Sequence, residues 1–394
     1  MKKIFSAAVM CGVALPAFAQ SSVTLYGLID EGVDFTNNAG GHHVVEMTSG
    51  YAQGSRWGVK GTEDLGGGLS AVFQLENGFN VNNGALAQGG REFGRQAFVG
   101  LSSERFGTVT LGRQYDAVVD YLALTTANGN WGGYMFSHPY DNDNTDNTFR
   151  LNNTIKYASP SFGGFAFGGT YSFSNDTGFA NNRQISVGAQ YTIGDWLFAA
   201  SYLNADNPGT TSGGAIAGAG GSLGADGNFV SSKLRIFGAG VNYTAGAATI
   251  GFAYTNTSID QPTANVAYLS GAETIQPVAG VLVGGTLTSL KFQNFELNGK
   301  YQFTPAFFVG GEYVYTIEHF DATTGRAKPG IHTIGLMADY NLSKRTDVYL
   351  QGVYQLIAGD QTGSSLDRAY VPGAQDLSST SRQVLVRAAL RHSF

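Results

Sequence analysis

The segment that decides the fold is the C-terminal stretch Gln383-Val-Leu-Val-Arg-Ala-Ala-Leu-Arg-His-Ser-Phe394. One set of alternate positions contains the apolar residues Val384, Val386, Ala388, Leu390 and Phe394, and only His392 interrupts it. The opposite set carries the polar side chains Gln383, Arg387, Arg391 and Ser393. Because successive side chains of a β-strand point to opposite faces, the pattern predicts a strand with one apolar and one polar face.

The same alternation recurs along the chain, for example in residues 165–173, 309–317 and 347–356. Each of these segments places aromatic or aliphatic side chains on one face and small or polar side chains on the other. Repeated segments of this kind, separated by turn-rich gaps, are typical of a transmembrane β-barrel. A soluble β-sandwich also alternates, so the parity of the residues does not by itself decide between the two classes.

Strand length and connection length favour the barrel. Many segments reach ten residues, which is enough for a tilted strand to cross a membrane. Short connections such as Phe162-Gly-Gly164 and Leu342-Ser-Lys344 alternate with long gaps near 205–230 and 258–284. We therefore predict an all-β fold of sixteen antiparallel strands, an even number, with both termini at the short-turn end.

The N-terminus has the features of a secretory signal peptide. Lys2 and Lys3 precede a short apolar segment, and Ala17-Phe-Ala19 forms a small-x-small cleavage site. The apolar segment is too short for a membrane anchor. We predict a signal peptide over residues 1–19 and a single transmembrane barrel domain over residues 20–394.

Composition excludes several classes of function. Cys11 is the only cysteine and lies in the predicted signal peptide, so the mature chain uses neither disulfides nor thiol chemistry. Without Lys2 and Lys3 the net charge is −8, which disfavours nucleic acid as a partner. His42 and His43 are adjacent, without the spacing of a rigid metal site. No pattern indicates an enzyme, a metal or a cofactor.

Several ordered segments of the mature chain resemble the Gram-negative general diffusion porins. They are Ser22–Asp30, Ser55–Leu65, Phe93–Leu101, Phe106–Gln114, Asn152–Tyr157 and the terminal Phe394. The resemblance implies a 16-stranded antiparallel barrel with short periplasmic turns, long external loops and a third external loop folded into the lumen. It also implies a homotrimer in the cell outer membrane, in contact with outer-membrane lipid and lipopolysaccharide, that passes small hydrophilic solutes and inorganic ions.

Parity predicts which basic side chains face the lumen. Trp57 and Val59 are apolar and should face outward, which points Arg56 and Lys60 inward. An arginine that faced lipid at mid-membrane would cost about 2–4 kcal/mol, so the inward choice is the stable one.

The same argument applies to the segment from Arg150 to Tyr157. Leu151, Ile155 and Tyr157 should face outward, which points Arg150 and Lys156 inward. Parity does not decide the direction of Arg95. The resemblance to porins does, because it implies that Arg56, Arg95 and Arg150 form an arginine cluster on the wall of the constriction.

Carboxylates near these arginines leave an alternative open. Glu76 is the best candidate partner, because Phe73 and Leu75 take the other face; Asp30, Asp116 and Asp120 are further candidates. The arginines could then brace the barrel without acting on permeant ions. Arg113 shares parity with Val109 and Leu111, so a simple strand would point it outward. It lies near the start of the long loop, where a bulge or a contact between subunits could accommodate it, and we do not assign it to the pore.

The segment from Tyr115 to Thr148 matches the position of the constriction loop of porins. Residues 121–140 contain no Asp or Glu, and carboxylates return only at Asp141, Asp143 and Asp146. Arginines that face a nearly uncharged loop should concentrate anions. The acidic net charge opposes this, but charges on outer loops are screened over about 8–10 Å at physiological salt.

The sequence therefore predicts a water-filled channel for passive diffusion with a weak preference for anions. Two alternatives remain open at this point. The barrel could be a channel selective for a particular solute, which saturable flux would reveal. It could also act mainly as an adhesin or receptor, or as a structural envelope protein, and would then conduct no ions.

Overall fold

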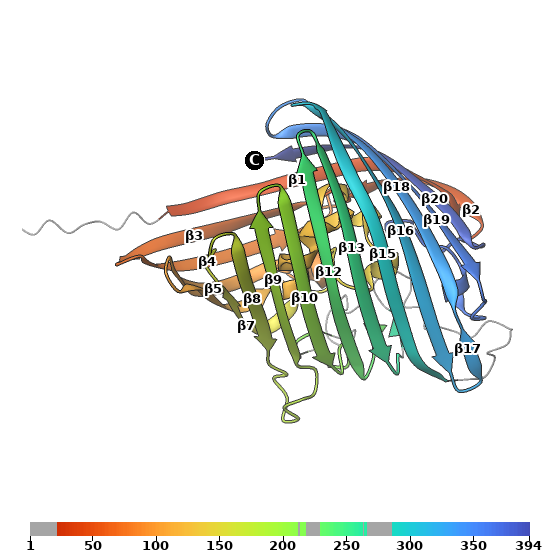
Figure 1. The fold of residues 1–394 in the computed structure, drawn as a ribbon, viewed down its shortest axis with the longest axis horizontal. Helices are drawn as coiled ribbons and strands as arrows, with labels where there is room; N and C mark the ends of the chain where they lie inside the picture. The colour runs from red at the N-terminus through yellow and green to blue at the C-terminus, as the bar shows by residue number, and fades with distance from the viewer. Residues whose placement is uncertain (1–21, 212, 218–228, 263, 266–285) are drawn as a thin grey trace, which may run out of the picture.

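The computed structural model describes residues 22–211, 213–217, 229–262, 264–265 and 286–394. The predicted signal peptide and parts of the two long gaps lie outside the described residues. Almost all described strands join one antiparallel sheet that curves into a barrel (Figure 1). The strands of this sheet are β1 (Ser22–Ala39), β2 (His42–Ser49), β3 (Arg56–Gly66), β4 (Leu69–Gly78), β5 (Gln96–Ser103), β6 (Gly107–Gln114), β7 (Leu151–Ala158), β8 (Phe165–Ser172), β9 (Gln184–Ile193), β10 (Trp196–Asp206), β12 (Lys233–Ala245), β13 (Ala248–Asp260), β15 (Leu287–Thr304), β16 (Phe307–Ala322), β17 (Gly325–Ala327), β18 (Pro329–Asn341), β19 (Thr346–Gly359) and β20 (Arg382–Ser393). A separate two-stranded sheet contains β11 (Phe229–Val230) and β14 (Ala264–Asn265).

These strands occupy sixteen positions around a closed barrel, as predicted. Strands β2 and β3 both pair with β1 and share one position, and β17 and β18 both pair with β16 and share another. The barrel closes between β1 and β20, in a register that places Leu28 opposite Ser393. Closure leaves no unpaired edge, which a sheet in a membrane requires.

The two ends of the barrel differ in the length of their connections. At one end the connections are tight. Gly163 and Gly164 turn between β7 and β8 with φ values of +61° and +92°, which favour glycine. Residues 342–345 join β18 to β19. The long connections lie at the other end, as predicted.

The C-terminal strand has the predicted two faces. Val386, Leu390 and Phe394 are exposed on the outer wall, whereas Gln383 and Arg387 are fully buried inside the barrel. The backbone N–H of Phe394 donates to the carbonyl of Gly27 at 3.0 Å, which fixes the end of the chain to β1.

The connection between β6 and β7, residues 115–150, folds into the lumen, as predicted for the third external loop. It is built from short helices, some of them inside the barrel in Figure 1. The Ala117 N–H donates to Ser186 Oγ, and Asn242 donates to the carbonyl of Leu124, so the loop is fastened to the inner wall. The short helices of the chain are α1 (Ala87–Gly90), α2 (Ala117–Asp120), η1 (Leu122–Thr125), η2 (Asn128–Gly132), η3 (Tyr134–Phe136), η4 (Pro139–Asp141) and η5 (Ser365–Asp367).

A second connection also folds inward, and the sequence analysis did not predict it. Between β19 and β20, Leu366 and Val371 are fully buried, and the ring of Tyr370 stacks on Tyr140 of the third loop at 6.3 Å. Leu366, Tyr370 and Tyr140 form an apolar core inside the barrel with Phe292 of the wall, and Val371 belongs to a second apolar cluster. Packed side chains thus occupy part of the lumen near the loop end.

Within the described residues, no helix is both long enough and apolar enough to cross a membrane.

Candidate pore constriction

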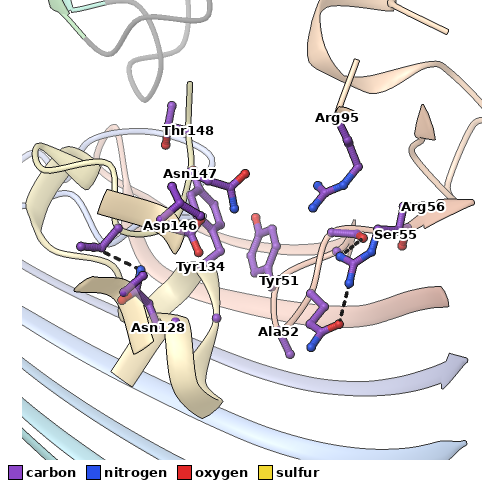
Figure 2. A pocket seen from close by; sticks show the side chains of 18 of the residues that line it. Tyr51, Ala52, Ser55, Arg56, Arg95, Asn128, Tyr134, Asp146, Asn147 and Thr148 are labelled. Atoms are coloured by element: carbon purple, nitrogen blue, oxygen red, sulfur yellow. Dashed lines mark hydrogen bonds between the residues drawn. The ribbon is translucent and has the colours of Figure 1, made fainter. Parts of the chain in front are cut away.

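A cavity of about 600 Å³ lies in the lumen between the barrel wall and the third loop. Arg56, Arg95 and Arg150 all line it. Figure 2 shows Arg56 and Arg95 on one side and residues of the third loop on the other, with the Arg95 side chain extended toward the loop. The structure thus brings together the three arginines that the sequence analysis grouped.

Glu76 joins two of these arginines. Arg95 Nε donates to Glu76 Oε1 at 2.8 Å, and Arg56 Nε lies 3.8 Å from Glu76 Oε2. Tyr26 also donates its hydroxyl to this carboxylate. Glu76 is therefore shared by two guanidinium groups, and one negative charge balances only one of the two positive charges.

Arg150 reaches the cavity from the end of the third loop. Its guanidinium lies over the ring of Tyr115, 5.7 Å from the ring centroid, while the Tyr115 hydroxyl accepts a hydrogen bond from Arg95 at 3.0 Å. Tyr115, at the start of the same loop, therefore contacts both arginines and holds them at one level of the lumen.

The local backbone near Arg150 differs from the prediction. We expected Leu151 on the outer wall, but it is fully buried in the apolar core inside the barrel. Asn153 has a φ of +54°, which interrupts the alternation of faces. Beyond this point the predicted parity holds, because Ile155 is exposed on the outer wall.

The loop side of the cavity is polar. Asn128, Tyr134, Asp146, Asn147 and Thr148 face the arginines across the cavity, and Tyr51 lies between the two sides (Figure 2).

Asp146 is the only carboxylate among the described residues that line this cavity. The two acids that precede it in residues 141–146, Asp141 and Asp143, are completely buried. Burial raises the pKa of Asp146 to about 7, although the charges of Arg150 and Arg95 act in the opposite direction. The carboxyl is therefore only partly ionised near neutral pH.

Two basic residues of the cavity were missed by the sequence analysis. Lys300 of β15 and Arg391 of β20 both line it. Arg391 is engaged by Asp347 and Asp339 at 3.1 and 3.5 Å, whereas no carboxylate of the described residues lies within salt-bridge distance of Lys300. Parity could have revealed Lys300, because Leu297 and Tyr301 point to the outer wall.

Lys60 and Lys156 face the lumen, as parity predicted, but they line a neighbouring cavity of about 380 Å³. Lys60 lies over the ring of Tyr26, 5.1 Å from the ring centroid. Lys156 forms a salt bridge with Asp120 of helix α2. The predicted site residues Lys60, Lys156 and Asp120 are therefore not part of the constriction cavity.

Asp116 also departs from the prediction. It is fully buried, and its Oδ1 accepts hydrogen bonds from the N–H groups of Val118 and Val119 at 2.7 and 3.3 Å, which caps helix α2. Its Oδ2 accepts from Asn144 at 2.6 Å. Burial raises the pKa of Asp116 to about 6. The residue organises the third loop and pairs with none of the arginines.

A β-bulge places Arg113 inside the protein. The ladder between β6 and β7 shifts register between Gly112 and Gln114, and Gly112 has a φ of +136°. Arg113 is buried and donates from Nε to the carbonyl of Gly94 at 2.8 Å. It therefore lies away from the lipid, where a regular strand would have pointed it.

A buried ionic cluster fastens the third loop to β15. His138 Nδ1 lies 2.5 Å from Asp143 Oδ2, and His138 Nε2 lies 3.0 Å from Glu296 Oε2 on the wall. Burial alone would lower the pKa of His138, but the two carboxylates raise it well above its usual value. The protonated imidazole thus bridges loop and wall, which keeps the constriction rigid.

A closed barrel in which an inward loop faces a basic wall across a solvent cavity defines a transmembrane channel. Within the described residues, no group of three or more His, Cys, Asp or Glu could hold a metal ion.

Comparisons with known proteins define the family. A sequence profile of the Gram-negative porins matches residues 6–357, and the chain belongs to this family. An outer membrane porin protein of Bordetella pertussis is 34% identical over 90% of this chain and 94% of its own. Outer membrane porin protein 32 of Delftia acidovorans is 34% identical over 52% of this chain and 57% of its own.

Solved structures show the same fold. An anion-selective porin from Comamonas acidovorans superimposes with a TM-score of 0.69 at 24% identity, covering 95% of this chain and all of that one. The trimer form of the outer membrane protein OmpT of Vibrio cholerae has a TM-score of 0.64 at 17% identity, covering 95% of this chain and 99% of that one. The chain is thus an outer-membrane porin, a channel for passive diffusion.

Proposed function

We propose that this porin passes small hydrophilic solutes and inorganic ions with a weak preference for anions, and that Arg56, Arg95 and Arg150 set this preference. The chain carries no reaction of its own in this proposal and needs no cofactor. Solutes move down their concentration gradients, and the wall of the constriction decides how readily each charge enters.

One observation carries the proposal: the constriction cavity is lined by five basic side chains and one carboxylate. The basic residues are Arg56, Arg95, Arg150, Lys300 and Arg391. Salt bridges offset part of this charge, because Glu76 engages two of the arginines and Asp347 and Asp339 engage Arg391. An excess of positive charge remains, and in a narrow polar passage it raises the local concentration of anions.

Asp146 keeps the preference weak. Its carboxyl faces the arginines from the loop side and is only partly ionised near neutral pH. We therefore expect cations to be disfavoured but not excluded. The solved relative from Comamonas acidovorans is described as an anion-selective porin, which supports the same direction of selectivity.

We also propose that the functional unit is a homotrimer, embedded in outer-membrane lipid and lipopolysaccharide. The solved trimer form of the Vibrio cholerae protein supports this assembly. Each protomer would then contribute its own pore, because the constriction described above is complete within one chain.

The proposal is tested by the triple variant R56Q/R95Q/R150Q, reconstituted in a planar bilayer under a KCl gradient. We expect the ratio of anion to cation permeability to fall several-fold while the channel still conducts. The matched control is R105Q/K344Q/R345Q, which removes three exposed positive charges at the short turns. Equal selectivity in the triple variant and the wild type would show that the arginines only brace the wall.

A further inference from the structure

Aromatic side chains line the constriction cavity beside the basic ones. The interior of a transmembrane barrel that conducts water is ordinarily polar. At this level of the lumen, however, Tyr51, Tyr134 and Phe308 line the cavity together with the arginines. All three side chains are only half-buried, so part of each ring is open to the solvent of the cavity. The narrow part of the pore therefore offers aromatic surface as well as positive charge.

The two tyrosines form a fixed pair of rings. Their ring centroids are 5.4 Å apart and the ring planes meet at 71°, which is the edge-to-face arrangement that aromatic rings prefer. The backbone N–H of Tyr134 donates to the carbonyl of Tyr51 at 2.8 Å. The Tyr51 hydroxyl donates to the carbonyl of Gly373 in the connection between β19 and β20. The pair is therefore held in position by two inward connections before any solute arrives.

Arg56 and Arg95 face this pair across the cavity, as Figure 2 shows. Glu76 and Tyr115 accept from Nε and Nη2 of Arg95. The Nη1 group of Arg95 lies over Gly54, where a Cβ atom would come within 2.9 Å of it. Within the described residues, this Nη1 has no hydrogen-bond acceptor. Arg95 thus retains donor capacity for an anion in the cavity.

Phe308 of β16 and Lys300 of β15 repeat the combination of a ring and a cation. The ammonium group of Lys300 lies 5.9 Å from the centroid of the Phe308 ring, and both residues line the same cavity. Phe308 also packs against the apolar cluster that contains Trp131 and Phe136. The cavity therefore combines aromatic surface with positive charge at two places on its wall.

An inorganic anion uses only the positive charge of such a wall. A small aromatic carboxylate uses both parts, because its carboxylate accepts hydrogen bonds from a guanidinium group while its ring packs edge-to-face on a tyrosine. The cavity of about 600 Å³ has room for a single-ring acid and surrounding water. Binding has to stay weak, because a permeating solute must also leave the site.

We propose that the constriction binds aromatic monocarboxylates of the size of benzoate as they permeate, with the ring on Tyr51 and Tyr134 and the carboxylate on Arg95 and Arg56. This inference rests on the proposed preference for anions and adds the class of organic anion that the pore favours. Positive charge alone would not distinguish an aromatic acid from an aliphatic acid of similar size.

Block of the chloride current through the full chain in a planar bilayer tests the proposal. Benzoate and cyclohexanecarboxylate carry the same charge on rings of similar size, and both are ionised at neutral pH. We expect benzoate to reach half-block of the wild-type channel at a concentration about three- to tenfold lower. In Tyr51→Leu and in Tyr134→Leu, the half-block concentrations of the two acids should become similar. Tyr51→Phe, the matched control, keeps the ring and should keep the difference.

The comparison of two acids within one variant does not depend on how well that variant conducts. Equal half-block concentrations in the wild type would overturn the proposal. A wild-type difference that persists in both leucine variants would remove the tyrosines from the site, and loss of the difference in Tyr51→Phe would assign it to the hydroxyl group. The proposed function fails on a different readout, the reversal potential in a KCl gradient, so the two failures are distinguishable.

Discussion

Two arginine sites of this barrel use the same side chain for different purposes. Arg387 of β20 is fully buried and lies 2.9 Å from Asp34 and 3.1 Å from Asp30, with Tyr349 accepting from its Nε at 3.0 Å. At the constriction, by contrast, one carboxylate, Glu76, is shared by Arg56 and Arg95. The first site has two acids for one arginine, and the second has one acid for two.

We infer from this difference that the balance of charge, and not the presence of an arginine, decides whether an arginine stabilises the barrel or can attract anions into the pore. A guanidinium flanked by two carboxylates exerts little net positive field on an ion in the lumen. Two guanidinium groups that share one carboxylate leave positive charge at the cavity. Tyr51 contacts both sites, because it lines the cavity while its ring lies 4.6 Å from the guanidinium of Arg387.

The largest expected effect is a loss of stability when the buried ion pairs of Arg387 are removed. Arg387→Met leaves Asp30 and Asp34 buried without their cation, and removal of one partner from a buried ion pair costs about 3–5 kcal/mol. The free energy of unfolding, measured by urea titration of the barrel in lipid vesicles, should fall by this amount. Arg345→Gln, at an exposed turn, is the control. A loss below about 1 kcal/mol would mean that Arg387 is not a brace.

A second substitution tests the proposed role of excess positive charge at the constriction. Lys300 lines the constriction, and no carboxylate in the part of the chain that the structure describes lies within salt-bridge distance of it. Lys300→Gln therefore removes positive charge without leaving an orphaned acid. One unit charge is worth about 0.5 kcal/mol at about 8 Å in water, with opposite signs for anions and cations. We expect the anion-to-cation permeability ratio in a planar bilayer to fall about two- to fivefold, with unchanged stability. An unchanged ratio would show that excess charge does not set selectivity.

A smaller effect comes from pH. The pKa of Asp146 is about 7, so the carboxyl is neutral below this pH and charged above it. Because the added negative charge faces the arginines, the preference for anions should decrease as the pH rises from 6 to 8. In Asp146→Asn the ratio should stay at its low-pH value throughout this range. A wild-type ratio that rises with pH would contradict this assignment.

The smallest effect on selectivity is expected at Asp116. Its carboxylate caps helix α2 and accepts from Asn144, away from the constriction cavity. Asp116→Asn can retain the cap but places an amide against Asn144, at a cost of about 1 kcal/mol. Reversal potentials of this variant and the wild type should agree. A clear shift of the reversal potential would mean that Asp116 contributes to ion selectivity.

The sequence predicted the barrel because alternation is a local property of each strand. Strand number, closure and the inward third loop followed from this pattern and from the resemblance to porins. Arg56 and Lys60 were oriented correctly because Trp57 is exposed on the outer wall. A regular strand needs only one such residue to fix the direction of its neighbours.

The prediction failed where the backbone is irregular or the partner is distant. The positive φ of Asn153 turned Leu151 inward, which is not visible as a break in alternation. The bulge at Gly112 that buries Arg113 is one of the two possibilities that the sequence left open for this residue. The positions of Asp116 and Asp120 depend on how the third loop folds. The inward connection between β19 and β20 depends on packing between segments more than 200 residues apart, such as Tyr140 and Tyr370.

In the proposed function, the guanidinium groups at the constriction give the channel its selectivity. The most direct test is the reversal potential of the wild-type protein in a planar bilayer that separates two KCl concentrations. The excess of positive charge predicts a potential with the sign of an anion-selective channel. A potential with the sign of a cation-selective channel would leave the porin fold intact and contradict this account of its constriction.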